Sequence, residues 1–501
     1  MLPRTPLHRW LAVAFFVLVI VWYHPNFSGS SIGDSSSTTG FSGNGVDDLT
    51  YVRKLLKDNK IGPEIEYAAR TIRYVPDATQ RKSITEVNQN LFPQSFKNIT
   101  ISKNQNLPSS RLLDIHVKHS PRPDQVDASD LIFGVSTTYD RFTNEGTSPM
   151  KEWVRWLTDG NGRTNGAGLI LALFNTTEEN LGNAAKTLES VGINATVVPS
   201  NLELDMPGRY VDLVHMLYNH PTRNSRKYFV LIDDDTFFPY MNEFRNTLRQ
   251  YDPTKPYYIG TFTERVDWIL QNGAPFAYGG GGIVLTEPAC QKIVSLPCLE
   301  KKEDGSYVLA SDQGDRLLFN CLREHTDITL TYLPSLHQED QFGDPSGFYE
   351  SGIQPLSLHH YKSWHHFNPD RMHVVADACG ESCVLQRFQF LDNYIITNGF
   401  SVVHYPQGID FDPLQVEGTF GSGNDGNPLL HETVFSYSFG QLRKSMNHTG
   451  KKKGWELLGA KKEGDGRVKQ VYVKRRGEGR WLAEGEDAPL RDSIVVLTWI
   501  P

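Results

Sequence analysis

Three consecutive aspartates carry the clearest chemical signal in this sequence. Asp233, Asp234 and Asp235 directly follow the apolar segment 228–232, YFVLI. Adjacent carboxylates at the end of a hydrophobic strand repel one another unless a cation or hydrogen-bond donors offset their charge. Side-chain alternation would put Asp233 and Asp235 on the same side of an extended strand, where one of them can bind a hard divalent cation. The run predicts a metal site, and a solvated acidic turn or a helix N-terminus is the alternative.

Phosphatases of the haloacid dehalogenase type also place aspartates after an apolar strand, and their first Asp is a covalent nucleophile. In that pattern D-x-D is followed by one residue and then by Thr or Val. Counted from Asp233, that position holds Phe237, and Thr236 comes one place too early. The spacing therefore disfavours phosphatase chemistry.

Four glycines follow at 279–282, inside the apolar segment PFAYGGGGIVLT. A flexible linker would have polar neighbours, so this run instead predicts close approach of the backbone to a sugar or another strand, or positive φ angles. A tight structural turn without a ligand is the alternative. The run does not open the first βαβ unit, which disfavours a G-x-G-x-x-G phosphate loop.

Two later segments supply an acid and two imidazoles. The pattern SDQGDRLLFNCL (311–322) predicts a helix that begins near Asp312 and has Asp315 in its first turn. A carboxylate there, facing a sugar site, can take a proton from an acceptor hydroxyl. His359 and His360 follow another apolar strand, and a neutral imidazole can complete a metal site that carboxylates begin. Helix capping by Asp312 and a structural role for the histidines are the ordinary alternatives.

The elements that must position these residues alternate between β-rich and helical patterns. The strand-like runs are LIFGVST (131–137), GLILALF (168–174), ATVVP (195–199) and KYFVLI (227–232), and the helix-like runs are WVRWL (153–157), NLGNAAKTLESVG (180–192) and 208–219. This alternation predicts an α/β domain with a largely parallel, buried sheet, whose ligands bind beyond the carboxyl ends of the strands. Beyond it, VKQVYVKRR and SIVVLTWI predict an antiparallel accessory element.

The N-terminus has the pattern of a membrane signal. Arg4, His8 and Arg9 precede an apolar run at 10–23, which predicts a signal anchor that leaves the rest of the chain in the lumen. A cleaved signal peptide and a buried helix are the alternatives. The stretch 28–45 is too poor in apolar residues to fold and predicts a flexible stalk.

Sequons and cysteines suit a secretory lumen. N-x-S/T sequons begin at Asn26, Asn98, Asn175, Asn194 and Asn447, and five cysteines lie between 290 and 383. The short intervals 290/298 and 379/383 suggest local disulfides that leave Cys321 over, although connectivity cannot be read from sequence and a zinc site is the competing interpretation.

Composition excludes several classes of protein. The 501 residues are 39% hydrophobic and 22% charged, which is typical of a globular chain rather than a disordered or collagen-like one. The 50 basic and 58 acidic residues give a net charge of −8, which argues against a nucleic-acid partner.

Taken in order, the motifs resemble the Fringe-like family of β-1,3-glycosyltransferases, including a related plant and fungal domain of unknown function. The resemblance spans about 130–364 and rests on IFGVSTT followed by WVRWL, VLIDDDTFF, YGGGGIVLT, GDRLLFNCL, and LHQED followed by LSLHH. It implies a GT-A fold, which is Rossmann-like and binds nucleotide sugars, a UDP-sugar donor and a Mn²⁺ ion. It also implies metal roles for Asp235 and His359, nucleotide contacts at Thr137, Thr138, Asp233 and Asp234, and a sugar-facing backbone at Gly280, Gly281 and Gly282.

The general base follows from the same resemblance. Family members usually show an acidic pair before the helix, where this sequence has Gly314 and Asp315. Counting back from Cys321 assigns the base to Asp315, with Asp312 as the second candidate.

These inferences predict a type II membrane glycosyltransferase of the Golgi or another secretory membrane. It would transfer a sugar from a UDP-sugar to a glycan or glycoprotein hydroxyl, with inversion. The predicted parts are a tail and anchor (1–23), a lumenal stem and lead-in (24–129), the glycosyltransferase domain (130–375) and a β-rich accessory region (376–501). A catalytically inactive, membrane-tethered glycan-binding relative of the same fold is the alternative.

Overall fold

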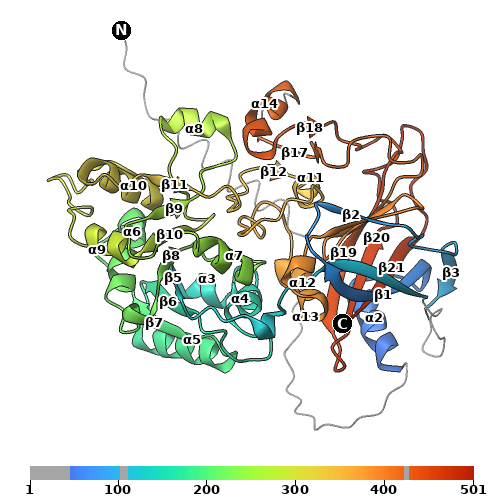
Figure 1. The fold of residues 1–501 in the computed structure, drawn as a ribbon, viewed down its shortest axis with the longest axis horizontal. Coiled ribbons are helices and arrows are strands. Elements are labelled where there is room, and N and C mark those ends of the chain that lie inside the picture. Colours follow the sequence, from blue (N-terminus) through green and yellow to red (C-terminus); the bar gives the residue numbers. More distant parts are fainter. Residues whose placement is uncertain (1–45, 102–110, 423–427) are drawn as a thin grey trace. The chain divides into compact units, whose positions relative to one another are not determined.

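The computed structural model of the protein describes residues 46–101, 111–422 and 428–501 (Figure 1). The predicted anchor (1–23) and the stalk stretch 28–45 lie outside the described residues. Within the described part of the chain, no helix combines the length and the apolar character that a membrane crossing needs.

A seven-stranded sheet carries the motifs. Its strand order is β11-β9-β10-β8-β5-β6-β7. Strands β8, β5, β6 and β7 are parallel, as the alternating pattern predicts, whereas β10 runs antiparallel to β8 and β9. The strands are β5 (Leu131–Thr138), β6 (Gly168–Phe174), β7 (Ala195–Pro199), β8 (Tyr228–Leu231), β9 (Tyr258–Gly260), β10 (Ile283–Thr286) and β11 (Leu330–Tyr332).

Helices cover both faces of this sheet, which explains its continuous apolar strands. The adjacent β5 residues Ile132 and Phe133 point to opposite faces. Ile132 packs in one cluster with residues of α6, α9 and α10, and Phe133 packs in another with residues of α4, α5 and α7. The helices are α3 (Tyr139–Thr143), α4 (Met150–Leu157), α5 (Glu178–Ser190), α6 (Met206–Tyr218), α7 (Met241–Leu248), α8 (Val266–Asn272), α9 (Glu287–Ile293) and α10 (Gly314–His325).

A second, ten-stranded sheet joins the predicted lead-in to the C-terminal region. Strands β20 and β21 pair antiparallel, as their sequences predict. Four further strands come from residues 64–118, which the sequence assigns to the stem and lead-in (24–129). β1 pairs in parallel with β21, from Ile65 opposite Asp492 to Arg73 opposite Ile500. This pairing joins residues over four hundred positions apart, so no local pattern reveals it. The strands are β1 (Glu64–Ala78), β2 (Ile84–Val87), β3 (Lys97–Thr100), β4 (Leu112–Lys118), β13 (Arg387–Phe390), β14 (Tyr394–Thr397), β15 (Ser401–His404), β19 (Lys453–Lys462), β20 (Val468–Lys474) and β21 (Asp492–Ile500).

The remaining elements complete the described fold. They are α2 (Val46–Asp58), α11 (Ser346–Tyr349), α12 (Pro369–His373), α13 (Ala376–Cys379), α14 (Pro428–Phe439), β12 (Phe342–Gly343), β16 (Val416–Glu417), β17 (Phe420–Gly421), β18 (Leu442–Arg443) and the 3-10 helices η1 (Pro123–Gln125), η2 (Arg223–Ser225) and η3 (Glu381–Cys383).

The disulfides correct one expectation. Cys379 and Cys383 are bonded, as their spacing suggests, but Cys298 bonds Cys321 rather than Cys290. Cys298 lies beyond the end of α9 and meets α10, where Cys321 sits on the buried side. Cys290 belongs to α9 itself and is a buried free thiol.

Candidate active site

The three aspartates follow β8 in a turn rather than on an extended strand. Asp233 and Asp235 nevertheless face the same side, as expected, because both lie near His359 Nε2. The Thr236 N–H donates to the Asp233 carbonyl at 3.2 Å. The Thr236 hydroxyl donates to the Gly280 carbonyl at 2.9 Å and accepts from the Asp233 N–H at 3.1 Å. The turn is therefore tied directly to the glycine run.

Asp235 and the two histidines meet on one side of this turn. His359 Nε2 lies 3.1 Å from Asp235 Oδ1 and 3.5 Å from Asp233 Oδ2. Asp235, His359 and His360 each offer one ligand atom, and these three atoms lie within 4.8 Å of one another. His360, to which the resemblance gives no role, thus joins the two residues predicted as metal ligands.

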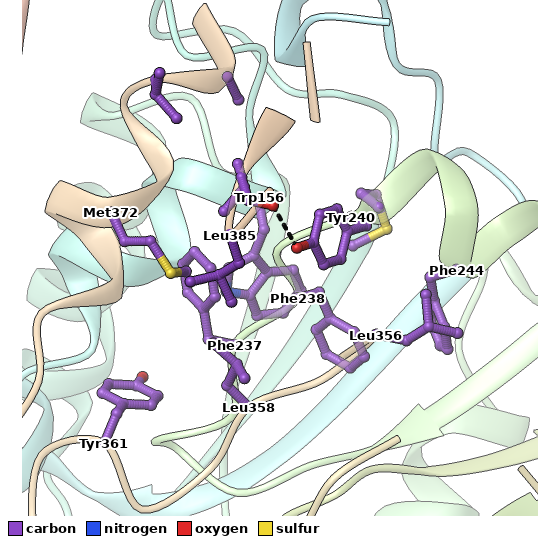
Figure 2. Packing of buried hydrophobic residues seen from close by; sticks show 14 of the residues in the cluster. Trp156, Phe237, Phe238, Tyr240, Phe244, Leu356, Leu358, Tyr361, Met372 and Leu385 are labelled. Atoms are coloured by element: carbon purple, nitrogen blue, oxygen red, sulfur yellow. Dashed lines mark hydrogen bonds between the residues drawn. The ribbon is translucent and has the colours of Figure 1, made fainter. Parts of the chain in front are cut away.

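The segments on either side of these residues pack together beneath the site. Phe237 and Leu358 exchange two backbone hydrogen bonds, of 2.9 and 2.8 Å, which hold the aspartate turn beside the histidine pair. Figure 2 shows their side chains in one buried apolar cluster with Phe238 and Tyr361. The Tyr240 hydroxyl closes the cluster by donating to the Val384 carbonyl at 2.7 Å.

Backbone contacts also fix how His359 faces the carboxylates. Its Nδ1 lies 3.1 Å from the Gln338 carbonyl, which favours an N–H there and directs Nε2 toward Asp235. Gln338 belongs to the predicted LHQED motif, and its neighbour Glu264 holds the motif by accepting backbone N–H bonds from Gln338, Glu339 and Asp340. Sequence reasoning missed Glu264, because nothing in its local pattern indicates a partner over seventy residues away.

The charges of the cluster are strongly coupled. Burial opposes the charged form of His359, but Asp235 and Asp233 outweigh it and raise the pKa of His359 to about 10. Burial likewise would raise the pKa of Asp235, but the charge and hydrogen bond of His359 hold that pKa below its usual range. Burial and then the charge of His359 lower the pKa of His360 to about 2. Desolvation and the neighbouring carboxylates raise the pKa of Asp233 to about 7, although 43% of its side chain is exposed.

Asp234 is engaged by a residue that sequence reasoning missed. Arg141 donates to both Asp234 oxygens, at 2.8 and 2.6 Å, in the bidentate geometry that guanidinium and carboxylate favour. The Thr137 hydroxyl donates to the same carboxylate at 2.5 Å. Thr138 instead caps α3 by accepting the Arg141 N–H at 3.2 Å. The sequence indicated a role for Arg141 only through its position just after the end of β5, the strand that pairs with β8.

In the glycine run, Gly280, Gly281 and Gly282 each disfavour a side chain for a specific reason. A Cβ on Gly280 would lie 2.2 to 2.5 Å from three atoms of the His359 ring, and one on Gly281 would lie 2.7 Å from Thr261. Gly282 has a φ of +94°. The Gly281 N–H donates to the Gln338 side chain at 2.8 Å, so the run is part of the same network.

Asp315 reaches the glycine run from the first turn of α10. Its carboxylate accepts the Gly279 N–H at 3.1 Å and the Arg316 N–H at 2.7 Å. Burial raises its pKa, and these N–H bonds oppose the rise. Asp312 is exposed and lies before the helix, and the N-cap is Gln313 rather than Asp312. Of the two predicted bases, the structure brings Asp315 to the site.

The donor set of Asp235, His359 and His360 fits a divalent cation. The 3.1 Å between Asp235 Oδ1 and His359 Nε2 is close to the separation of two ligands at right angles around an ion about 2.1 Å from each. One carboxylate and two imidazoles suit the first-row divalent metals.

Comparison with known proteins gives this geometry a family context. Residues 208–378 match the family model described as Fringe-like, a segment that runs from α6 through the aspartates, the glycines and the histidine pair. A beta-1,3-glucosyltransferase of Mus musculus is 25% identical over 159 residues, which are 32% of this chain and 29% of the mouse protein. The match thus spans less than a third of the length of that relative.

Solved glycosyltransferases are similar only at low scores. A glycosyltransferase of Streptococcus pneumoniae is 13% identical with a TM-score of 0.30, over 49% of this chain and 59% of that one. A mannosyltransferase of Pyrobaculum calidifontis, in complex with GDP-Man and Mn²⁺, is 12% identical with a TM-score of 0.24, over 36% and 50%. Scores this low add nothing to the description of the site.

The family match thus falls on the mixed α/β unit with the central sheet and spans the candidate site. Over residues 208–378 the chain is therefore similar to the Fringe-like family.

Proposed function

We propose that this protein transfers a sugar from a UDP-sugar to a hydroxyl of a glycan or glycoprotein, with a bound Mn²⁺ ion and with inversion of the anomeric carbon. One observation carries the proposal. Asp235, His359 and His360 converge beside Gly280, within the segment that matches the Fringe-like family.

In this proposal Asp235, His359 and His360 hold the cation. When bound, it neutralises the diphosphate that leaves the sugar. The protein's own contribution is to fix the ligands, through the Gln338 carbonyl on His359 and the backbone pairing of Phe237 with Leu358. Arg141 neutralises Asp234 and so reduces the repulsion among the three aspartates, beside the place proposed for the nucleotide.

Asp315 is the proposed general base. Its hydrogen bond to the Gly279 N–H anchors the carboxylate at the glycine run, whose backbone would face the sugar. Asp315 takes the proton of the acceptor hydroxyl while the hydroxyl oxygen attacks the anomeric carbon from the face opposite the diphosphate. A single displacement of this kind inverts that carbon.

The proposal includes a type II protein of the Golgi or another secretory membrane, with its catalytic domain in the lumen. Basic residues ahead of the apolar run 10–23 support this topology. The two disulfides, Cys298–Cys321 and Cys379–Cys383, suit an oxidising compartment.

The test is release of UDP by the purified full chain from a panel of UDP-sugars, with a mixed set of aryl glycosides as acceptors. We expect release with a restricted set of donors, dependence on added Mn²⁺ after EDTA treatment, and loss in Asp235→Ala. Asp312→Ala, at an exposed position before α10, is the matched control and should keep activity. Wild-type release by a folded Asp235→Ala variant would refute the metal assignment. No release with any donor would favour the inactive glycan-binding relative.

A further inference from the structure

A polar cavity lies beside β1 and β3 of the ten-stranded sheet. It has a volume of about 390 Å³, and its lining includes Arg70, Lys97 and Arg111 together with Phe92, Gln94 and Ser95. Its lining contains no carboxylate. Three cations around one cavity, without an acid among them, point to an anionic occupant.

Arg70 is the strongest evidence that the occupant of the cavity is an anion. Its residue is only 4% exposed, and its Nε and Nη1 are buried without a hydrogen-bond partner. Burial, followed by the charge of Arg111, lowers the pKa of Arg70. The nearby carboxylate of Asp392 instead accepts the N–H groups of Leu91 and Phe92, each at 3.0 Å. A buried guanidinium that no described residue pairs is costly, and an oxyanion in the cavity would offset that cost.

The backbone at the cavity is also available to a ligand. On one edge β1 pairs with β3 through Glu64–Tyr67 and with β4 from Thr71 onward. Residues 68–70 fall between these two partners, so on this edge their backbone has no partner strand among the described residues. This break in the pairing lies where the cavity opens, because Ala68 and Ala69 also line it.

We propose that this cavity binds the carboxylate or sulfate group of an acidic sugar. Guanidinium groups recognise such oxyanions through paired, charge-assisted hydrogen bonds. The volume lies within the usual range for small-molecule sites and suits one or two sugar rings. Gln94 and Ser95 offer partners for sugar hydroxyls, and the Phe92 ring offers an apolar surface. The choice of a sugar as carrier rests on the proposed function, whereas the binding of an oxyanion does not.

The test is calorimetric titration of the full chain with glucuronic acid and with N-acetylglucosamine 6-sulfate. Glucose and N-acetylglucosamine are the neutral matches, and inorganic sulfate tests the anion alone. We expect each acidic sugar to bind more tightly than its neutral match and than inorganic sulfate. The affinity should fall as the NaCl concentration rises. Arg70→Met should weaken binding about 10- to 100-fold, the usual range for hydrogen bonds to charged groups. Lys186→Gln, at an exposed position on α5, should change nothing.

Several outcomes would overturn the proposal. Equal affinity for acidic and neutral sugars, or unchanged affinity in Arg70→Met, excludes recognition by these cations. Inorganic sulfate binding as tightly as the sulfated sugar reduces the cavity to a general anion site. If Arg70→Met does not fold, the double variant Lys97→Gln/Arg111→Gln decides, because both residues are exposed. The titration uses no donor and no turnover, so a failure of the proposed transferase activity leaves its result unaffected.

Discussion

Replacing Gly280 by alanine tests whether His359 must lie where the structure has it. The backbone of Gly280 is not in the left-handed region, so alanine is conformationally acceptable there. The added Cβ would nevertheless lie 2.2 Å from His359 Cε1, 2.3 Å from Nδ1 and 2.5 Å from Nε2. The ring, the glycine or both must move.

The size of the movement follows from these distances. Ordinary contact begins at 3.4 Å, so an overlap of 1.2 Å (3.4 − 2.2) must be relieved. The ring has little room, because Nδ1 is bonded to the Gln338 carbonyl and the centroid of the His360 ring lies 3.7 Å from that of His359. A displacement of about 1 Å in a catalytic site typically costs about 100-fold in rate. We expect a loss of this order in UDP release by Gly280→Ala.

Electron paramagnetic resonance of Mn²⁺ gives a readout that does not depend on the donor. Gly280→Ala should bind Mn²⁺ about 10- to 100-fold more weakly than the wild type. Two glycines serve as controls. Gly282→Ala introduces strain at a φ of +94° but meets no atom closer than 3.6 Å, so it should cost about 1–2 kcal/mol of stability and leave Mn²⁺ affinity unchanged. Gly464→Ala meets nothing within 4 Å and should be neutral. Wild-type Mn²⁺ affinity and turnover in a folded Gly280→Ala variant would refute the placement of His359.

Three further predictions concern the base, a disulfide and a buried acid. Asp315→Asn should lower kcat by about 10²- to 10⁴-fold with little change in the KM for the donor. If steady-state kinetics show an unchanged kcat, Asp315 is not the general base. Cys321→Ser removes the bond to Cys298, which closes a loop of sequence separation 23, and should cost about 3 kcal/mol in urea unfolding; a loss below about 1 kcal/mol would contradict this. Burial raises the pKa of Glu381 to about 8, so the folded protein keeps a proton that the unfolded chain releases near pH 4.3. Stability should therefore fall as pH rises between these values, less steeply in Glu381→Gln, and equal slopes in the two urea titrations would exclude the effect.

The part of the fold that could be predicted is the part whose pattern is local. The strands β5 to β8 are short apolar runs separated by helical periodicity, so their number and parallel direction follow from the alternation. The ten-stranded sheet differs, because its β1–β21 pair joins segments that lie over four hundred residues apart in the chain. Such pairing depends on complementary strand faces that meet only in the folded protein. For this reason the sequence assigns the strands of residues 64–118 to a stem and lead-in.

The candidate site divides in the same way. Asp235, His359 and Asp315 stand in motifs whose residue types suggest their chemistry, and the structure brings all three to the glycine run. Arg141 and Glu264 were missed, because each acts through a partner distant in sequence and neither lies in an unusual local pattern. Spacing along the chain indicates which groups can react, but it does not indicate which groups hold them.

The aspartate run shows why that distinction matters for interpreting charge clusters. Three adjacent carboxylates suggest one shared cation, yet each has its own environment. Asp234 is paired with Arg141, Asp235 with His359, and Asp233 remains partly exposed to solvent. Asp233 and Asp235 both face His359 Nε2, whereas Asp234 faces Arg141, so these two cations offset part of the repulsion. Of the three carboxylates, Asp235 is the one that the described residues arrange with both histidines for a metal. The candidate metal site is therefore set by the meeting of Asp235 with the histidine pair rather than by the number of aspartates.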